Sequence, residues 1–410
     1  MTIDAREQTR SRLIGTMFTS NALSSTAFIG TVTVSSLVAE QITGSASLSG
    51  LPNTMGTVAA AAGAAILSAL SFKFGRRRTF AAGLALAGAG SLLAALSVAL
   101  NSFPLLLVSM MVLGFGWSVS HLARFAAGDL RPPERRASAI SLIVWASTIG
   151  AIVGPSLIGP TSNMALTAGL DPLIGPITVG VAGFSLAAFI TFVGLRPEPL
   201  TLTIAPEGEQ HCEASPLSEI LTMPPVRLAI VAVMTSQFVM ILIMTMTPLH
   251  IRGNGGSLGT VGVVMMAHAT GMFAIAPITG RLVDRHGPRP LIVASVAVLT
   301  ISGLITAAAP RGNIAILVIG LFLLGVGWNF GFVAASTALQ IGLPTANRLK
   351  IQGAADAIMW TSGGTAAAVS GIILGTSSFT VVAIVGAVCA LAPIPFIIGT
   401  RPRAETRASG

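Results

Sequence analysis

Three residues in the fourth apolar stretch of the chain could act on a solute. Trp117, His121 and Arg124 are spaced by four and three positions, so a helix would present all three on one face. Together they offer an aromatic surface, a titratable ring and a fixed cation. Polar side chains are costly inside apolar helices, so we interpret these three as candidates for a substrate cavity. For Arg124 two alternatives stay open, because its guanidinium could reach lipid headgroups from the helix end or pair with Asp129.

Titratable groups are otherwise rare in the apolar stretches. Asp356 lies about one turn into the predicted eleventh helix, where a buried carboxylate could accept a proton during a transport cycle. The alternative is a structural acid near a helix N-terminus, paired with Arg348 or Lys350. His268 could also be a hydrogen-bonded core histidine. The candidates for proton coupling are therefore His121, His268, Asp356 and Glu40.

The composition around these residues is that of a membrane protein. The 410 residues are 53% hydrophobic and 9% charged, and the mean hydropathy is +0.84. A soluble domain has roughly a quarter charged residues, so lipid is the natural exterior of this chain. The two cysteines, Cys212 and Cys389, lie far apart in different settings and indicate neither a disulfide nor a metal site. We expect no metal and no cofactor.

Stretches that are long and apolar enough to cross a bilayer occur twelve times. A hydrocarbon core of ~30 Å needs about 20 helical residues. The stretches are 13–40, 50–72, 79–100, 103–127, 137–159, 173–195, 227–251, 258–282, 289–309, 313–338, 352–376 and 379–400. The predicted fold is an all-α membrane protein, with twelve transmembrane helices in two pseudo-symmetric bundles, 1–195 and 227–410. The acidic, proline-containing segment 196–226 suits a cytoplasmic linker between them.

Basic residues gather in one set of the predicted loops. With both termini in the cytoplasm, all 23 lysines and arginines lie in cytoplasmic segments except Arg124, Arg252 and Arg311. Positive charge on the cytoplasmic side is typical of multi-pass membrane proteins. The formal net charge of +9 therefore reflects topology and does not indicate a nucleic-acid partner. We expect the plasma (inner) membrane as the location.

Two short sequences recur in the second part of the chain at nearly the same interval. The sequence LGFGW, which ends at Trp117, returns as LGVGW, which ends at Trp328. The turn that ends at Gly75 and precedes three arginines returns as the turn that ends at Gly287. An internal repeat of six-helix halves places a substrate site between the halves near the middle of the bilayer. Transport then follows from rocking of one half against the other.

The second copy of the turn resembles the signature of the major facilitator superfamily, and the resemblance covers nearly the whole chain. It places a glycine, an acid, an arginine, a glycine and a base in the order Gly280, Asp284, Arg285, Gly287 and Arg289. The resemblance implies a secondary transporter with alternating access. In this family the acid and the bases of the turn hold one conformation closed.

The first copy of the turn departs from this pattern. Gly75 and Arg76 are kept, but Ser68 stands where glycine is usual and Phe72 stands where the acid is usual. The acid-based contact is therefore doubtful in this half. The alternative for the basic run 73–78 is a simple anchor that fixes topology.

The fifth predicted helix carries a glycine-rich motif that resembles one found in proton-driven exporters of the family. Gly150 and Gly154 are four apart, which lets two helices approach closely, and Pro155 removes one backbone hydrogen bond. The resemblance also implies that the first, fourth, seventh and tenth helices line the cavity. Their polar and aromatic residues extend the predicted cavity beyond the fourth helix to Asn21, Gln237, Trp328 and Asn329.

These patterns together predict proton-coupled export of a small neutral or anionic organic compound. An anionic or neutral substrate is favoured because the predicted cavity helices carry a cation and aromatic rings, and their one acid, Glu40, lies at a helix end. The alternative is a proton-coupled importer (symporter) of a metabolite or vitamin. A remote alternative is an integral membrane enzyme, which would be expected to gather His, Asp or Glu at a membrane face. We expect a monomer, in contact with lipid, substrate and protons, and no enzymatic activity.

Overall fold

The computed structural model describes residues 3–44, 48, 50–203, 215–255, 258–309, 313–341 and 343–399, and its regular elements in these ranges are all helices. The first half of the chain forms α1 (Ile3–Thr43), α2 (Leu51–Phe74), α3 (Arg76–Ala99), α4 (Phe103–Asp129), η2 (Pro133–Arg135), α5 (Arg136–Thr167) and α6 (Ile174–Gly194). The short elements η3 (Pro199–Leu202) and α7 (Leu217–Thr222) follow. The second half forms α8 (Pro224–Gly253), α9 (Leu258–Phe273), α10 (Ala276–His286), α11 (Pro288–Ala308), α12 (Ile314–Ala338), α13 (Thr345–Thr376), α14 (Phe379–Cys389) and α15 (Ile394–Gly399).

Twelve segments of the described chain are long and apolar enough to cross a membrane, which confirms the predicted number. Two of the predicted spans are interrupted. The stretch 258–282 contains the turn between α9 and α10, and the stretch 379–400 contains the turn between α14 and α15. The helix α13 begins earlier than expected, at Thr345, so Asp356 lies about three turns inside it and not one.

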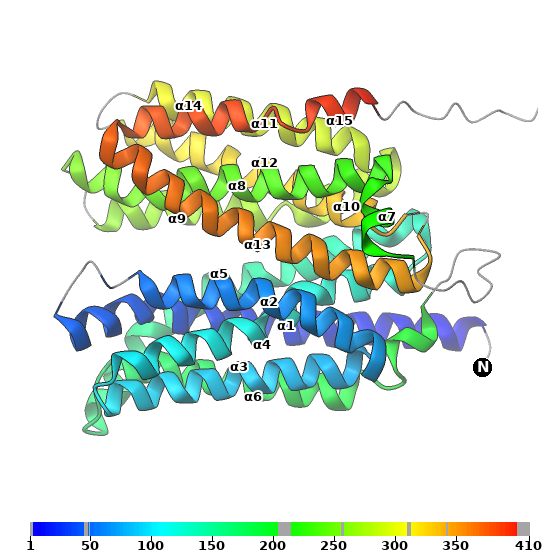
Figure 1. Cartoon of the computed structure of the whole chain (residues 1–410). Helices are drawn as coiled ribbons and strands as arrows, with labels where there is room; N and C mark the ends of the chain where they lie inside the picture. Colours follow the sequence, from blue (N-terminus) through cyan, green and yellow to red (C-terminus); the bar gives the residue numbers. More distant parts are fainter. Residues whose placement is uncertain are drawn as a thin grey trace, which may run out of the picture.

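Two glycines give the halves the same geometry at one end of the bundle. Gly75 ends α2 with a φ of +85°, and Gly287 ends α10 with a φ of +81°. A side chain is strained at such positive φ angles, so glycine permits α3 and α11 to begin at once in a new direction. We call the end of the bundle that carries these two turns the turn end; it lies at the right of Figure 1, as does the N-terminus.

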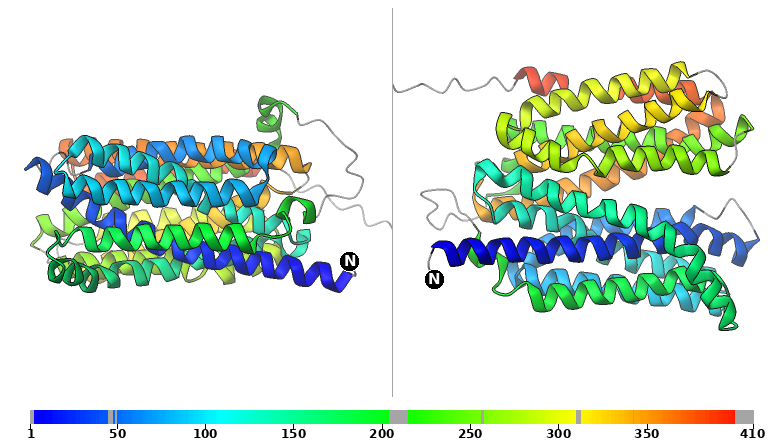
Figure 2. Two further views of the ribbon diagram at one scale, coloured as in Figure 1. Left: turned by 90° about the horizontal axis from the view of Figure 1, so that it is seen from below. Right: turned by 180° about the vertical axis from the view of Figure 1, so that it is seen from behind.

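The helices form two bundles that lie side by side in Figure 1 and in the right-hand view of Figure 2. In the first, α4 packs on α2 and α3, and α1 packs on α5 and α6; in the second, α12 packs on α9 and α11. Backbones come into direct contact at small residues. A Cβ atom at Gly90 would lie 2.5 Å from the backbone nitrogen of Leu113. Close approach of this kind is how helices associate in lipid, where burial of apolar surface adds little.

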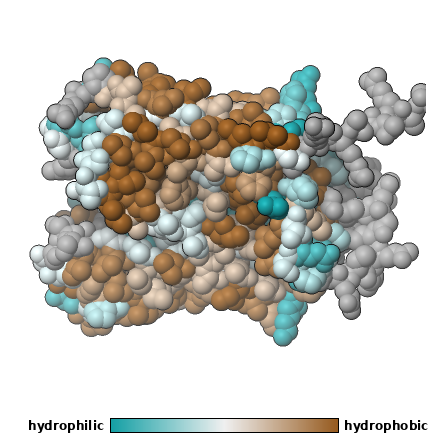
Figure 3. All heavy atoms as spheres, turned by 45° about the horizontal axis from the view of Figure 1, so that its top comes forward, coloured by the Kyte–Doolittle hydropathy of each residue, from teal (hydrophilic) through white to brown (hydrophobic). Residues whose placement is uncertain are grey.

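The outside of the structure is apolar around its middle. Figure 3 shows hydrophobic side chains across the body of one face and hydrophilic side chains towards the ends. Large apolar residues of the described helices are well exposed, for example Ile152 at 66% and Phe189 at 64%. Such a band matches the hydrocarbon layer of a bilayer, while the polar ends match its headgroup regions. The two halves meet where α13 packs on α2 and where α10 packs on α5.

Candidate functional site

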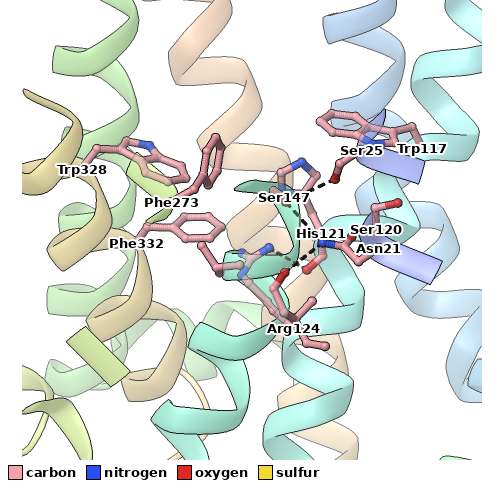
Figure 4. A pocket seen from close by; sticks show the side chains of 12 residues that line it. Asn21, Ser25, Trp117, Ser120, His121, Arg124, Ser147, Phe273, Trp328 and Phe332 are labelled. Atoms are coloured by element: carbon pink, nitrogen blue, oxygen red, sulfur yellow. Dashed lines mark hydrogen bonds between the residues drawn. The ribbon is translucent and has the colours of Figure 1, made fainter. Parts of the chain in front are cut away.

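A cavity of about 30 Å³ lies between the halves, where α1, α4 and α5 face α9 and α12. The first half contributes the amide of Asn21, the hydroxyl groups of Ser25, Ser120 and Ser147, and the side chains of Trp117, His121 and Arg124. The second half contributes the rings of Phe273, Trp328 and Phe332 (Figure 4). This space holds roughly two water molecules.

The predicted stripe on α4 lines this cavity along its whole length. Trp117 stacks on Phe28 with ring centroids 3.6 Å apart and meets the edge of His121 at 4.5 Å. Trp360, from α13 in the other half, closes the group at 5.7 Å from Trp117 and 5.0 Å from His121. Edge-to-face geometry of this kind is favourable between aromatic rings. The two halves are therefore in direct contact beside the cavity.

Arg124 forms an ion pair across the halves. Its Nη2 pairs with Asp356 Oδ1, its Nη1 lies 3.2 Å from Asp356 Oδ2, and its Nε donates to Ser336 Oγ at 3.0 Å. The guanidinium also lies 4.2 Å from the ring centroid of Phe332. The two charged side chains are 2% and 0% exposed.

This pair rules out the alternative partners considered for Arg124 and Asp356. Arg124 does not reach headgroups, because it is buried, and Asp129 is engaged elsewhere, with Arg76 and Arg348. A buried charge is costly unless a partner of opposite charge lies beside it. The sequence could not indicate the pair, because its members lie on different halves of the chain.

Two of the remaining cavity candidates also line the space. The amide nitrogen of Asn21 donates to the carbonyl of Ile143 at 2.9 Å and to Ser147 Oγ at 3.3 Å, which ties α1 to α5. Trp328 faces the cavity from α12, opposite Trp117, so the two tryptophans of the sequence repeat meet at one site (Figure 4).

Gln237 and Asn329 lie behind the cavity wall. Gln237 accepts a hydrogen bond from Trp328 Nε1 at 2.8 Å and therefore fixes the orientation of that ring. Asn329 donates to the carbonyl of Met272 at 2.7 Å and accepts from Thr279 Oγ1 at 2.5 Å. Both amides are at most 3% exposed. They hold the helices of the second half together and do not line the cavity.

Of the candidates for proton coupling, His268 lies away from the cavity and the side chain of Glu40 lies outside the described residues. His268 Nδ1 donates to the carbonyl of Leu321 at 3.0 Å, and the side chain is buried between α9 and α12. This position matches the core-histidine alternative. Glu40 lies near the end of α1, and its side chain is outside the described residues. His121 and Asp356 are the two candidates that the structure brings to the site, on either side of Arg124.

Asp284 of the second-half turn contacts the first half. Asp284 accepts hydrogen bonds from the backbone nitrogens of Ala137 at 2.8 Å and Ser138 at 2.9 Å, and from the Ser138 hydroxyl. These nitrogens open α5, where an acid is favourable. A Cβ at Gly280 would lie 2.8 Å from the carbonyl of Ala137, so glycine permits this approach. Arg289 donates to the carbonyl of Ile397, within its own half, and Arg285 is exposed.

The first-half turn obtains its acids from elsewhere. Phe72 is 60% exposed. Glu198, which follows α6, accepts from the backbone nitrogens of Arg76 at 2.6 Å and Arg77 at 3.1 Å, at the start of α3. Asp129, at the end of α4, pairs with Arg76 at 2.5 Å and with Arg348 of α13 at 3.3 Å. One buried acid thus bridges the halves on this side of the turn end.

The glycine motif of α5 packs against α1. A Cβ at Gly150 would lie 2.5 Å from Ser25 Cβ, and one at Gly154 would lie 3.1 Å from the carbonyl of Thr26. The helix continues through residue 155 to Thr167, and the side chain of Pro155 is outside the described residues. The motif therefore brings the α5 wall of the cavity against α1.

A helical spacing in the sequence also indicates the second-half wall of the cavity. Trp328, Phe332 and Ser336 are spaced by four, which repeats the stripe of α4 on α12. Phe332 lines the cavity and Ser336 binds Arg124. In the part of the chain that the structure describes, no group of three or more His, Cys, Asp or Glu residues could hold a metal ion.

Comparisons with known proteins agree with this architecture. A family model described as Major Facilitator Superfamily matches residues 16–255 and, in a second match, 232–410. The chain is 35% identical to the MFS-type transporter YdeG of Bacillus subtilis over 91% of this chain and 88% of that protein. It is 27% identical to the riboflavin transporter RfnT of Brucella anthropi, over 91% and 92% of the two chains.

The fold also matches solved structures. The human organic anion transporter MFSD10 superposes with a TM-score of 0.75 at 15% identity, over 95% of this chain and 99% of that chain. A match at this identity shows the fold alone. The family match excludes the membrane enzyme that we considered as a remote alternative. The chain belongs to the major facilitator superfamily and is a twelve-helix secondary transporter of the membrane.

Proposed function

We propose that this transporter exports a small neutral or anionic organic compound in exchange for protons. The observation that carries the proposal is the charge of the cavity. Among the residues that the structure describes, its lining holds one fixed cation, Arg124, and no acid, and the carboxylate of Asp356 is already paired with that cation. An organic cation would meet Arg124 without a free acid to balance its charge, whereas a neutral or anionic compound would not be repelled.

The proposed cycle uses two rigid halves, 1–195 and 227–410, that move about the linker 196–226. The turn end carries the basic residues, so we assign it to the cytoplasm, together with both termini. In this conformation Asp284 and Asp129 hold the halves together at that end. The closure supports an assignment in which the site is shut off from the cytoplasm, and opening requires these contacts to separate.

Proton coupling is proposed for Asp356 together with His121. Both lie at the contact between Arg124 and the second half, so a change in their charge acts on the pair that joins the halves. The glycine motif of α5 supports the direction of transport, since its resemblance is to exporters. We place the protein as a monomer in the plasma (inner) membrane of its cell.

Transport into proteoliposomes tests this proposal. Purified protein is reconstituted, and the uptake of a panel of neutral, anionic and cationic organic compounds is followed with a proton gradient imposed in each direction. We expect neutral or anionic compounds to move against the direction of the protons. If organic cations were the sole compounds transported, the charge argument would be wrong.

A second candidate function is proton-coupled import of a vitamin or related metabolite. It is favoured by the relative from Brucella anthropi, which is named a riboflavin transporter and matches most of this chain. The same assay separates the two candidates. Movement of the compound in the same direction as the protons supports import, and movement in the opposite direction supports export.

A further inference from the structure

The two walls of the cavity differ in chemistry. The first half offers groups that form hydrogen bonds, among them Ser120 and Ser147. The second half offers ring surfaces, from Phe273, Trp328 and Phe332 (Figure 4). Trp328 and Phe332 are stacked, with centroids 4.5 Å apart and planes 15° apart. A ligand that meets both walls therefore needs a flat apolar face and a polar edge.

Three ring nitrogens beside the cavity lack partners. Trp117 Nε1, His121 Nε2 and Trp360 Nε1 are buried and form no hydrogen bond with the residues that the structure describes. Their rings contact one another edge to face, so the nitrogens belong to one cluster that spans both halves. Buried polar atoms are normally satisfied, and an indole N–H can only donate, so the two tryptophan nitrogens favour a ligand whose polar edge carries acceptor atoms.

Arg124 supplies the charge of the site, but both of its side-chain partners come from the other half. Asp356 and Ser336 hold the guanidinium, which also lines the cavity. An acidic group on a ligand would therefore compete with Asp356 for the same cation. The ligand binds best when the pair across the halves is broken, and by linkage it favours that state.

We infer that the cavity, once it is widened by separation of the halves, takes a flat aromatic anion whose acidic group replaces Asp356 as the partner of Arg124. The inference rests on the proposed function and names its substrate class. The ring of the anion stacks on the second-half wall, and its acceptor atoms receive hydrogen bonds from the indole nitrogens. The exchange of partners releases α4 from α13 beside the cavity, so the substrate itself promotes separation of the halves at the turn end.

Calorimetric titration of the purified full chain in detergent tests this exchange without requiring transport. The probe is 2-naphthalenesulfonate, an aromatic anion that stays charged. The neutral naphthalene-2-sulfonamide and the non-aromatic cyclohexanesulfonate serve as matched compounds. We expect the aromatic anion to bind at least about tenfold more tightly than either. Equal affinity for all three compounds would overturn the inferred substrate class.

Variants test the competition with Asp356. In Asp356→Asn the rival charge is gone, so the affinity for 2-naphthalenesulfonate should rise about tenfold, whereas Arg124→Gln should lower it by at least as much. Ser336→Ala removes the second partner of Arg124 without a change of charge and should raise the affinity by roughly twofold to threefold. The control is Trp145→Phe, because Trp145 is 37% exposed on α5 and contacts Phe18 away from the cavity; its affinity should not change.

The outcomes separate this inference from the proposed function. An affinity that stays the same or falls in both Asp356→Asn and Ser336→Ala would overturn the exchange of partners. If Asp356→Asn does not fold, Ser336→Ala decides alone. If aromatic anions are transported but these variants bind the probe with unchanged affinity, the proposed function is supported and the exchange of partners is refuted. If anions bind as expected but neither anions nor neutral compounds are transported in proteoliposomes, the inferred site is supported and the proposed function is refuted.

Discussion

The contact of Asp284 with α5 leads to the sharpest prediction about the closed turn end. The change is Asp284→Asn, which keeps the shape of the side chain and removes its charge. The carboxylate accepts two backbone N–H bonds and one hydroxyl bond from the other half. An amide offers one oxygen, so at least one N–H loses its acceptor, and the favourable charge at the helix start is also lost.

The size of the effect follows from these contacts. A hydrogen bond to a charged group contributes about 1.5–3 kcal/mol, and an acid at a helix N-terminus about 0.3–1 kcal/mol. Because Asp284 is only half-buried, we take the lower part of the combined range, about 2 kcal/mol. Since 1.4 kcal/mol is tenfold in an equilibrium constant, the open population should rise about thirtyfold.

The assay measures the accessibility of the interface between α5 and α10. Ser141→Cys places a thiol where Gly280 covers α5, in a background in which Cys212 and Cys389 are replaced by serine. The thiol reacts with an impermeant maleimide only when this end opens. Asp284→Asn should accelerate labelling from the cytoplasmic side about thirtyfold.

Arg285→Gln is the matched control, because Arg285 is exposed on the same turn and its loss should leave the labelling rate unchanged. A rate in Asp284→Asn within about twofold of that control would refute the reasoning, since Asp284 would then not hold the halves together.

Three further changes test other parts of the structure. Arg124→Gln should reduce transport in proteoliposomes at least tenfold while membrane insertion stays normal. The reason is that the variant leaves a buried acid without its cation and alters the cavity. Full activity of the variant would show that Arg124 does not belong to the functional site. Gly150→Val should lower stability by about 1–3 kcal/mol, measured by thermal unfolding, because its Cβ would collide with Ser25 Cβ. Gly159→Val, with nothing within 4 Å, should have a much smaller effect. Asp129→Asn should cost about 3–5 kcal/mol by leaving two buried arginines without their acid, whereas Glu7→Gln, in a half-exposed pair, should cost below about 1 kcal/mol; similar melting temperatures for these two variants would contradict this reading.

Local sequence patterns were sufficient for the helices and for the stripe on α4. Hydrocarbon thickness fixes the length of a span, so apolar stretches could be counted directly. Helical periodicity placed Trp117, His121 and Arg124 on one face, and the structure brings that face to the cavity. The boundaries were less well determined, because α13 begins before its apolar stretch does and so carries Asp356 deeper than expected.

The roles of the polar residues depended on partners that are distant in the chain. Asn329 belongs to α12, which lines the cavity, and Gln237 belongs to α8, which packs beside it. Their hydrogen bonds nevertheless hold both amide groups away from the cavity. The acids that serve the first-half turn, Glu198 and Asp129, lie far from the position where the family pattern places one. A motif describes positions in a local sequence, so it cannot show that an acid from another segment occupies the same space.

The amino-acid sequence was enough to predict twelve membrane crossings, a repeat of two halves and one strong turn motif at Asp284, because each of these follows from composition or from short-range spacing. The pairing of Arg124 with Asp356, and the division of the cavity into a polar wall and an aromatic wall, became visible in the folded structure alone. Its residues come from both halves, and the packing of one half against the other selects which side chains meet. The stripe of Trp117, His121 and Arg124 is therefore half of a site, and α12 and α13 supply the rest.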